Sequence, residues 1–83
     1  MNENEKWVTH DMTVAATLVY FGESIVDIQK NFQGNIEFTF KKSHNLEDLI
    51  KAFELDELNV SPRRFSVALK DIKKIIFSHK LNH

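Results

Sequence analysis

The sequence predicts a small α+β domain in which an antiparallel hairpin or three-stranded sheet packs against helices. Apolar and polar residues alternate between residues 23 and 40, and this period of two is typical of strands. The segments before and after it carry the boundary residues and the apolar spacing of helices. Because the 83 residues include two Gly and one Pro, no long flexible linker is expected. We therefore expect one two-layer domain of order (β)αββαα.

Both ends of the chain are polar, and within a single domain of residues 1–83 we expect residues 1–6 and 80–83 to be frayed. Residues 7–9 (Trp-Val-Thr) are apolar or β-branched and predict an added edge strand. The acidic beginning differs from the basic start and apolar centre of an export signal. The chain contains no Cys, which is consistent with a cytoplasmic protein.

The first helix is expected over residues 12–21. Asp11 precedes this segment as an N-cap, and Gly22 follows it at the position where helices often end in a left-handed residue. Several β-branched residues favour a strand instead, but both boundary residues favour a helix. Its main apolar face contains Val14, Leu18 and Phe21. Since the segment is apolar nearly all round, the helix is expected to be central and covered on several sides.

A β-hairpin is expected over residues 23–40. Asp27 and Gln29 alternate with apolar residues on one side of a turn at Gln33 and Gly34, and Glu37 and Thr39 do so on the other. The face directed at the core is predicted to contain Val26, Ile28, Ile36, Phe38 and Phe40.

A second helix is expected from residue 46 to about residue 55. Asn45 precedes it as a candidate N-cap, and Glu47 and Asp48 lie in the first turn, where the helix dipole favours anions. Its buried stripe is predicted to contain Leu46, Leu49, Ile50 and Phe53.

The third helix is expected to begin at Ser61 and Pro62, an N-cap followed by proline at the first helical position. At 100° per residue one side collects apolar side chains and the other collects cations. The predicted inner residues are Phe65, Ala68, Leu69, Ile72, Ile75 and Ile76. On the outer side, Arg63, Lys70 and Lys74 form a cationic stripe.

Charge is distributed unevenly along the chain. Residues 59–83 carry six basic side chains and one acid, whereas residues 1–58 carry five basic side chains and eleven acids. The net charge of -1 therefore hides a cationic last element attached to an acidic remainder. An anionic partner is expected to meet the last helix, and broad binding of nucleic acid by the rest of the chain is excluded.

The candidate binding surface is the outer side of the third helix, because a row of basic side chains can follow phosphates or contact an acidic partner. Apolar side chains among the cations suit a partner surface better than water. Solubility alone also explains a charged outer face, and self-association explains the apolar residues equally well. The candidate residues are Arg63, Arg64, Val67, Lys70, Lys73, Lys74 and Phe77.

Catalytic and metal-binding signatures are weak. Asp11 beside His10 is explained as a helix cap, and no nucleophile with a motif context accompanies the pair. His79 and His83 have the i, i+4 spacing of helical metal ligands, but no third ligand accompanies them. We therefore expect no enzyme activity, no catalytic residues, no metal, no cofactor and no small-molecule substrate. The longest apolar stretch, residues 14–21, is far shorter than the roughly 20 residues that cross a bilayer, so no membrane association is expected.

Three segments resemble a small family of prokaryotic and phage proteins known as a domain of unknown function. They are residues 15–18 (Ala-Ala-Thr-Leu), residues 36–40 (Ile-Glu-Phe-Thr-Phe), and the helix opened by Arg63, Arg64 and Phe65. The resemblance implies the same order of elements, a prokaryotic or phage setting and a shared role for the two arginines. It implies no activity.

The expected function is that of a small non-enzymatic binding module that engages a macromolecule, in a phage or mobile-element setting. A protein partner, or a second copy in a homodimer, is one class of partner. The alternative is nucleic acid, bound for regulation through the basic last helix.

Overall fold

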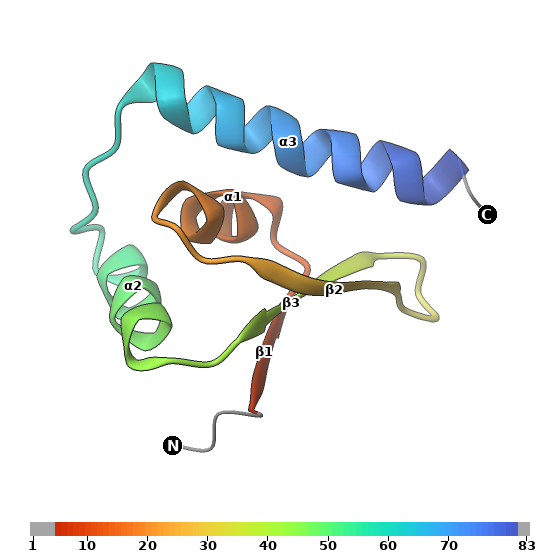
Figure 1. The fold of residues 1–83 in the computed structure, drawn as a ribbon, viewed down its shortest axis with the longest axis horizontal. Coiled ribbons are helices and arrows are strands. Elements are labelled where there is room, and N and C mark those ends of the chain that lie inside the picture. Colours follow the sequence, from red (N-terminus) through yellow and green to blue (C-terminus); the bar gives the residue numbers. More distant parts are fainter. Residues whose placement is uncertain (1–4, 82–83) are drawn as a thin grey trace.

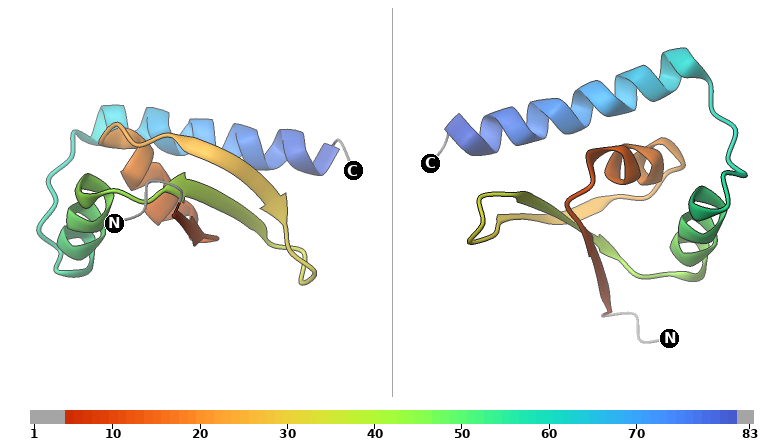
Figure 2. Two further views of the ribbon diagram at one scale, coloured as in Figure 1. Left: turned by 60° about the horizontal axis from the view of Figure 1, so that its bottom comes forward. Right: turned by 180° about the vertical axis from the view of Figure 1, so that it is seen from behind.

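Strands and helices follow one another as βαββαα in the computed structural model, which describes residues 5–81 (Figure 1). This order confirms the predicted α+β class. The elements are β1 (Lys6–Thr9), α1 (Met12–Tyr20), β2 (Ile25–Lys30), β3 (Ile36–Lys41), α2 (His44–Glu54) and α3 (Pro62–Leu81). Helix α1 lies between α3 and the strands, and α2 lies at one end of the molecule, as the two further views in Figure 2 also show.

The sheet has the order β1-β3-β2, and both pairings are antiparallel. Central strand β3 places Phe40 opposite Trp7 of β1 and Phe38 opposite Ile28 of β2. The apolar residues at the start of the chain therefore form the added edge strand that the sequence predicts. Strand β1 begins one residue earlier than expected, because Lys6 pairs with Lys41 instead of fraying. Helix α3 likewise continues through Leu81, into the second segment expected to fray, while residues 1–4 and 82–83 lie outside the described part.

The hairpin contains a β-bulge, and the prediction that Val26 faces the core is wrong. The pairing register shifts between Ile25 and Asp27, and the Val26 side chain is 49% exposed. Ile25 pairs with Phe40 and is half-buried, so it takes the core-facing place. A strict alternation cannot include the extra residue that a bulge inserts. The other four predicted inward residues are buried or half-buried, namely Ile28, Ile36, Phe38 and Phe40.

Both ends of α1 carry the predicted boundary residues. The Asp11 carboxylate accepts hydrogen bonds from the backbone N–H groups of Thr13 (2.8 Å) and Val14 (3.2 Å). At the other end Gly22 has φ +98°, and the N–H of Glu23 donates to the carbonyl of Leu18 at 2.9 Å. This is the bonding pattern of a Schellman motif, in which the left-handed residue allows the chain to reverse.

Helix α2 begins earlier than the sequence predicts, and Asn45 is not its N-cap. The Ser43 hydroxyl accepts the hydrogen bond from the N–H of Leu46 (3.0 Å), and the helix starts at His44. Asn45 instead donates from its side-chain amide to Glu23 at 2.8 Å, a contact across 22 positions of sequence. Either residue type can cap a helix, so the choice depended on a tertiary contact.

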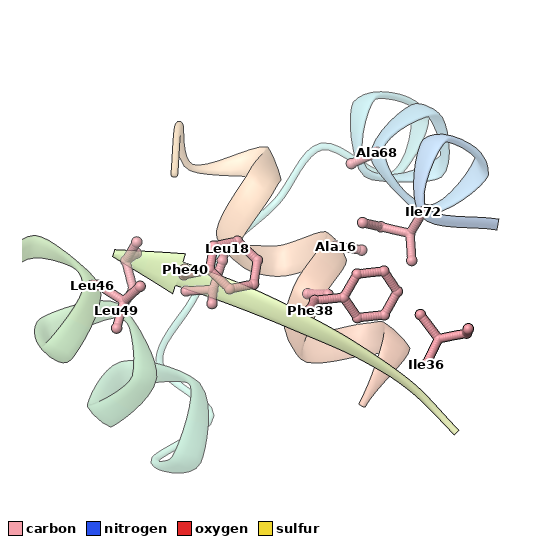
Figure 3. Packing of buried hydrophobic residues seen from close by; sticks show 10 residues of the cluster. Ala16, Leu18, Ile36, Phe38, Phe40, Leu46, Leu49, Ala68 and Ile72 are labelled. Atoms are coloured by element: carbon pink, nitrogen blue, oxygen red, sulfur yellow. The ribbon is translucent and has the colours of Figure 1, made fainter. Parts of the chain in front are cut away.

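The core forms where α1 meets both the sheet and α3. Ala15 and Ala16 of α1 have no exposed surface, which confirms the prediction of a central, covered helix. Their small side chains let α3 pack closely on α1, and the side chain of Ile72 of α3 points toward the ring of Phe38 (Figure 3). The largest fully buried side chains are Phe38, Phe40, Leu18, Leu46 and Ile72.

Candidate functional site

Helix α3 presents the candidate residues because its opposite side is held against α1. The N–H of Phe65 donates to the carbonyl of Ser61 at 2.8 Å, which closes the first turn next to Pro62. Ala68 and Ile72 are buried, and this fixes the rotation of the helix. All seven candidate residues are consequently exposed, namely Arg63, Arg64, Val67, Lys70, Lys73, Lys74 and Phe77.

Five of these residues share one narrow strip of the helix surface. At 100° per residue, Arg63, Lys70 and Lys74 fall within a sector of about 40°. Val67 and Phe77 widen that sector to about 80°, and their side chains are 56% and 64% exposed. We call these five residues the α3 outer face. Two further cations flank it, because Lys73 lies on one side of the strip and Arg64 on the other.

The cations of the α3 outer face keep their charge directed at solvent. Ion pairs join Lys42 to Glu5 at 3.5 Å and to Glu47 at 3.9 Å, and among the described side chains none involves Arg63, Lys70 or Lys74. Asp71, the acid within α3, lies about 80° from Arg63 around the helix. The strip therefore remains a cationic surface with apolar side chains set into it.

Arg64 differs from the other cations because it rests on Tyr20 at the end of α1. Its guanidinium carbon lies 5.7 Å from the ring centroid, a cation–π distance, and its terminal nitrogen donates to the Tyr20 hydroxyl at 3.4 Å. The same hydroxyl accepts a shorter hydrogen bond from the N–H of Ser61, at 2.9 Å. Tyr20 thus ties the beginning of α3 to the end of α1, and Arg64 belongs partly to this tether.

An open groove of about 880 Å³ runs along the flank of α3 beside Arg64. Its lining includes Val67 and Tyr20 together with the polar residues Asn59 and Asp71. Sequence reasoning missed Tyr20, Asn59 and Asp71. A signal existed for Tyr20, since a phenol in a largely apolar helix needs a hydrogen-bond partner. The groove extends the α3 outer face sideways, because Val67 contributes to both.

The remaining candidate residues of the sequence are the histidines and Asp11. Residues 5–81 contain no group of three His, Asp or Glu side chains that could hold a metal ion. His83, one half of the i, i+4 histidine pair, lies outside the described residues. Asp11 caps α1, as predicted, and so is engaged in backbone hydrogen bonds. None of the helices in this range combines the length and the apolar character needed to cross a membrane.

A family model, described as Domain of unknown function (DUF5659), matches residues 4–78. The chain belongs to this family. The match covers every strand and helix as far as the last turn of α3, and it confirms the expected small domain of unknown function. No curated protein and no solved structure matches the chain. The family description names no activity, so the role of this DUF5659 domain has to be argued from its surface.

Proposed function

We propose that this domain is a non-enzymatic binding module whose α3 outer face docks on an acidic, partly apolar surface of a partner protein. The observation that carries the proposal is that three aligned cations and two exposed apolar side chains share one strip of a single helix. Phe77 and Val67 would be buried on docking, and apolar burial is the main source of affinity in such interfaces. Arg63, Lys70 and Lys74 would set orientation and association rate.

The charge of the remainder supports a protein partner over nucleic acid. Residues 1–58 carry eleven acids, so a long polyanion lying across the domain would meet repulsion outside α3. Helix α3 has 20 residues and is about 30 Å long, enough for an interface made by one helix. A phenyl ring 64% exposed at one end of a phosphate-binding strip gains little from contact with phosphates.

Nucleic acid is the second candidate, favoured because no described carboxylate forms an ion pair with Arg63, Lys70 or Lys74. If Arg63, Lys70, Lys73 and Lys74 each contact a phosphate, the slope of log affinity against log salt is about −3 to −4. Heparin retention at low salt and binding of a labelled duplex or single strand are expected under this alternative.

Two double variants separate the candidates. Lys70→Glu with Lys74→Glu removes the charge, and Val67→Ser with Phe77→Ser removes the apolar groups. Each leaves the buried side of α3 unchanged, so both variants are expected to fold. The matched controls are Lys51→Glu, an exposed lysine of α2, and Val26→Ser at the bulge.

The measurement is the amount of any protein that co-purifies in stoichiometric quantity with the tagged domain from a lysate of its source organism. We expect each α3 double variant to lower that amount about tenfold or more, and the controls to leave it unchanged. If the charge variant alone has an effect, and labelled DNA or RNA binds with a steep salt dependence, the nucleic-acid candidate replaces the proposal. If neither α3 variant changes any interaction, the α3 outer face is a solvated surface and the proposal fails.

The proposal also includes a cytoplasmic location and a prokaryotic or phage setting, which rest on the absence of cysteine and on the sequence resemblance. The proposal assigns no catalysis and no cofactor. The α3 outer face contains three cationic side chains, one aliphatic side chain and one aromatic side chain, and this set does not combine a nucleophile with a general base. A screen with generic phosphatase, nuclease and esterase substrates checks this point, and turnover abolished by the α3 charge variant would contradict it.

A further inference from the structure

The loop between β2 and β3 holds one aromatic ring fully in solvent. The side chain of Phe32 is 99% exposed. Its loop nevertheless has a fixed shape, because the Asn31 side-chain oxygen accepts hydrogen bonds from the N–H groups of Gln33 and Asn35, both at 3.0 Å. The Asn31 amide also donates to Glu37 of β3 at 3.1 Å. A ring presented by such a scaffold loses little conformational entropy on binding, which is the property of an anchor residue.

An apolar pocket lies elsewhere on the same molecule, between β1, α1 and α2. Its volume is about 280 Å³, whereas an apolar cavity of about 150 Å³ is enough to bind benzene. One phenyl ring therefore fits. The apolar lining consists of Trp7, Val14, Leu18, Leu49, Ile50 and Phe53. We call this the α2 pocket.

The charges beside the ring and around the α2 pocket are opposite. Lys30 is exposed two positions before Phe32, and the loop from residue 30 to residue 35 contains no acid. Asp11 and Glu54 are exposed at the α2 pocket. A ring entering this pocket with its own loop would thus bring a cation to a pair of carboxylates, and such complementarity fixes orientation.

We propose that Phe32 of one copy inserts into the α2 pocket of a second copy. The loop cannot reach the pocket of its own chain, because in all three views the β2–β3 loop and α2 lie at opposite ends of the molecule (Figures 1 and 2). The loop and the α2 pocket are different surfaces, so the contact joins copies either reciprocally in a two-fold pair or head-to-tail in a chain or ring. The bulge at Val26 interrupts the regular edge of β2, which disfavours edge-to-edge pairing as the route to self-association.

This contact is independent of the proposed function, because the α3 outer face takes no part in it. A single inserted ring gives a weak interface, and the assembly is expected to form where the local concentration is high. Copies gathered by a common partner would meet that condition.

The chain has no Cys, so single cysteines report the contact cleanly. Gln33→Cys places a thiol beside Phe32 without removing the ring, and Glu54→Cys places one at the α2 pocket. The thiol of the Gln33→Cys variant is first converted to a mixed disulfide with thionitrobenzoate. The thiolate of the Glu54→Cys variant then attacks this disulfide, which links the two chains and releases thionitrobenzoate, and the rate of that release is measured. We expect Phe32→Ala in the Gln33→Cys chain to slow this exchange about tenfold.

Glu57→Cys, an exposed position just beyond α2 that does not line the pocket, is the matched control acceptor. It is expected to react slowly whether or not Phe32 is present. Equal exchange rates with and without the ring, or equal rates at positions 54 and 57, overturn the proposal.

Sedimentation equilibrium supplies a second, label-free measurement. Between about 10 μM and about 1 mM the average mass of the wild-type chain should rise above that of the monomer. Phe32→Ser should remain monomeric, and Lys70→Glu with Lys74→Glu should associate as the wild type does. A wild type that stays monomeric, or an association that Phe32→Ser does not change, shows that the α2 pocket does not accept Phe32.

Discussion

Replacing Tyr20 with Phe should destabilise the domain by about 1 kcal/mol, although the change removes one oxygen atom. The hydroxyl accepts a hydrogen bond of 2.9 Å from the N–H of Ser61, a partly buried residue at the beginning of α3. A neutral hydrogen bond contributes about 0.5–1.5 kcal/mol, and partial access of water to the freed N–H keeps the loss near the middle of that range. The second contact, from Arg64 at 3.4 Å, is long and exposed and adds little.

Urea and thermal unfolding measure this effect directly. For a domain of this size, 1 kcal/mol corresponds to a fall in Tm of about 4–8 °C. The Phe variant keeps the ring under the Arg64 guanidinium, so the cation–π contact should persist. Arg64→Ala in both backgrounds closes a double-mutant cycle, and we expect the coupling between Arg64 and the hydroxyl to be below about 0.5 kcal/mol. A Tm that changes by less than about 1 °C in Tyr20→Phe would show that the hydroxyl does not hold the start of α3.

Three further substitutions test the packing and the helix ends, each by urea denaturation. Ile72 has no exposed surface, so Ile72→Ala should lower the free energy of unfolding by about 2–5 kcal/mol. A decrease below about 1 kcal/mol would contradict close packing of α3 on α1. Asp56, just beyond the end of α2, has φ 57°. Asp56→Gly should raise the free energy of unfolding by about 0.5–1 kcal/mol. Glycine adopts this left-handed conformation without strain, and the change also removes an anion from the negative end of the helix dipole. Gly22→Ala should lower the free energy of unfolding by about 1–2 kcal/mol. The cause is the φ of +98° alone, since an added Cβ meets no atom within 4 Å. An unchanged midpoint of urea denaturation would argue against the Schellman motif.

Features that depend on neighbouring residues were predictable from the sequence. The Asp11 cap, the Gly22 terminus and the Pro62 start each act over one turn of helix, so the residue types identify them. The same holds for the inner residues of β3, where alternation continues without interruption. The α3 outer face was also predictable, because residues at a period of 3.6 share a side whatever lies beneath.

Two local predictions failed where a distant contact decided between local alternatives. Val26 and Ile25 are both apolar, and the bulge that exposes Val26 is defined by pairing with β3. Ser43 and Asn45 are both good caps, and the bond from Asn45 to Glu23 left the capping position to Ser43. In each case the sequence contained both choices with nearly equal local energy.

By itself, the sequence determined the kinds of elements, their order and the cationic side of the last helix, because these follow from spacing and from residues within a turn of one another. Tertiary structure alone decided that Arg64 rests on a tyrosine 44 positions away, and that Trp7 and Phe53 come together at the α2 pocket. The physical reason is that such contacts depend on how α1, α2 and α3 pack, and packing selects among partners that the local pattern leaves equivalent.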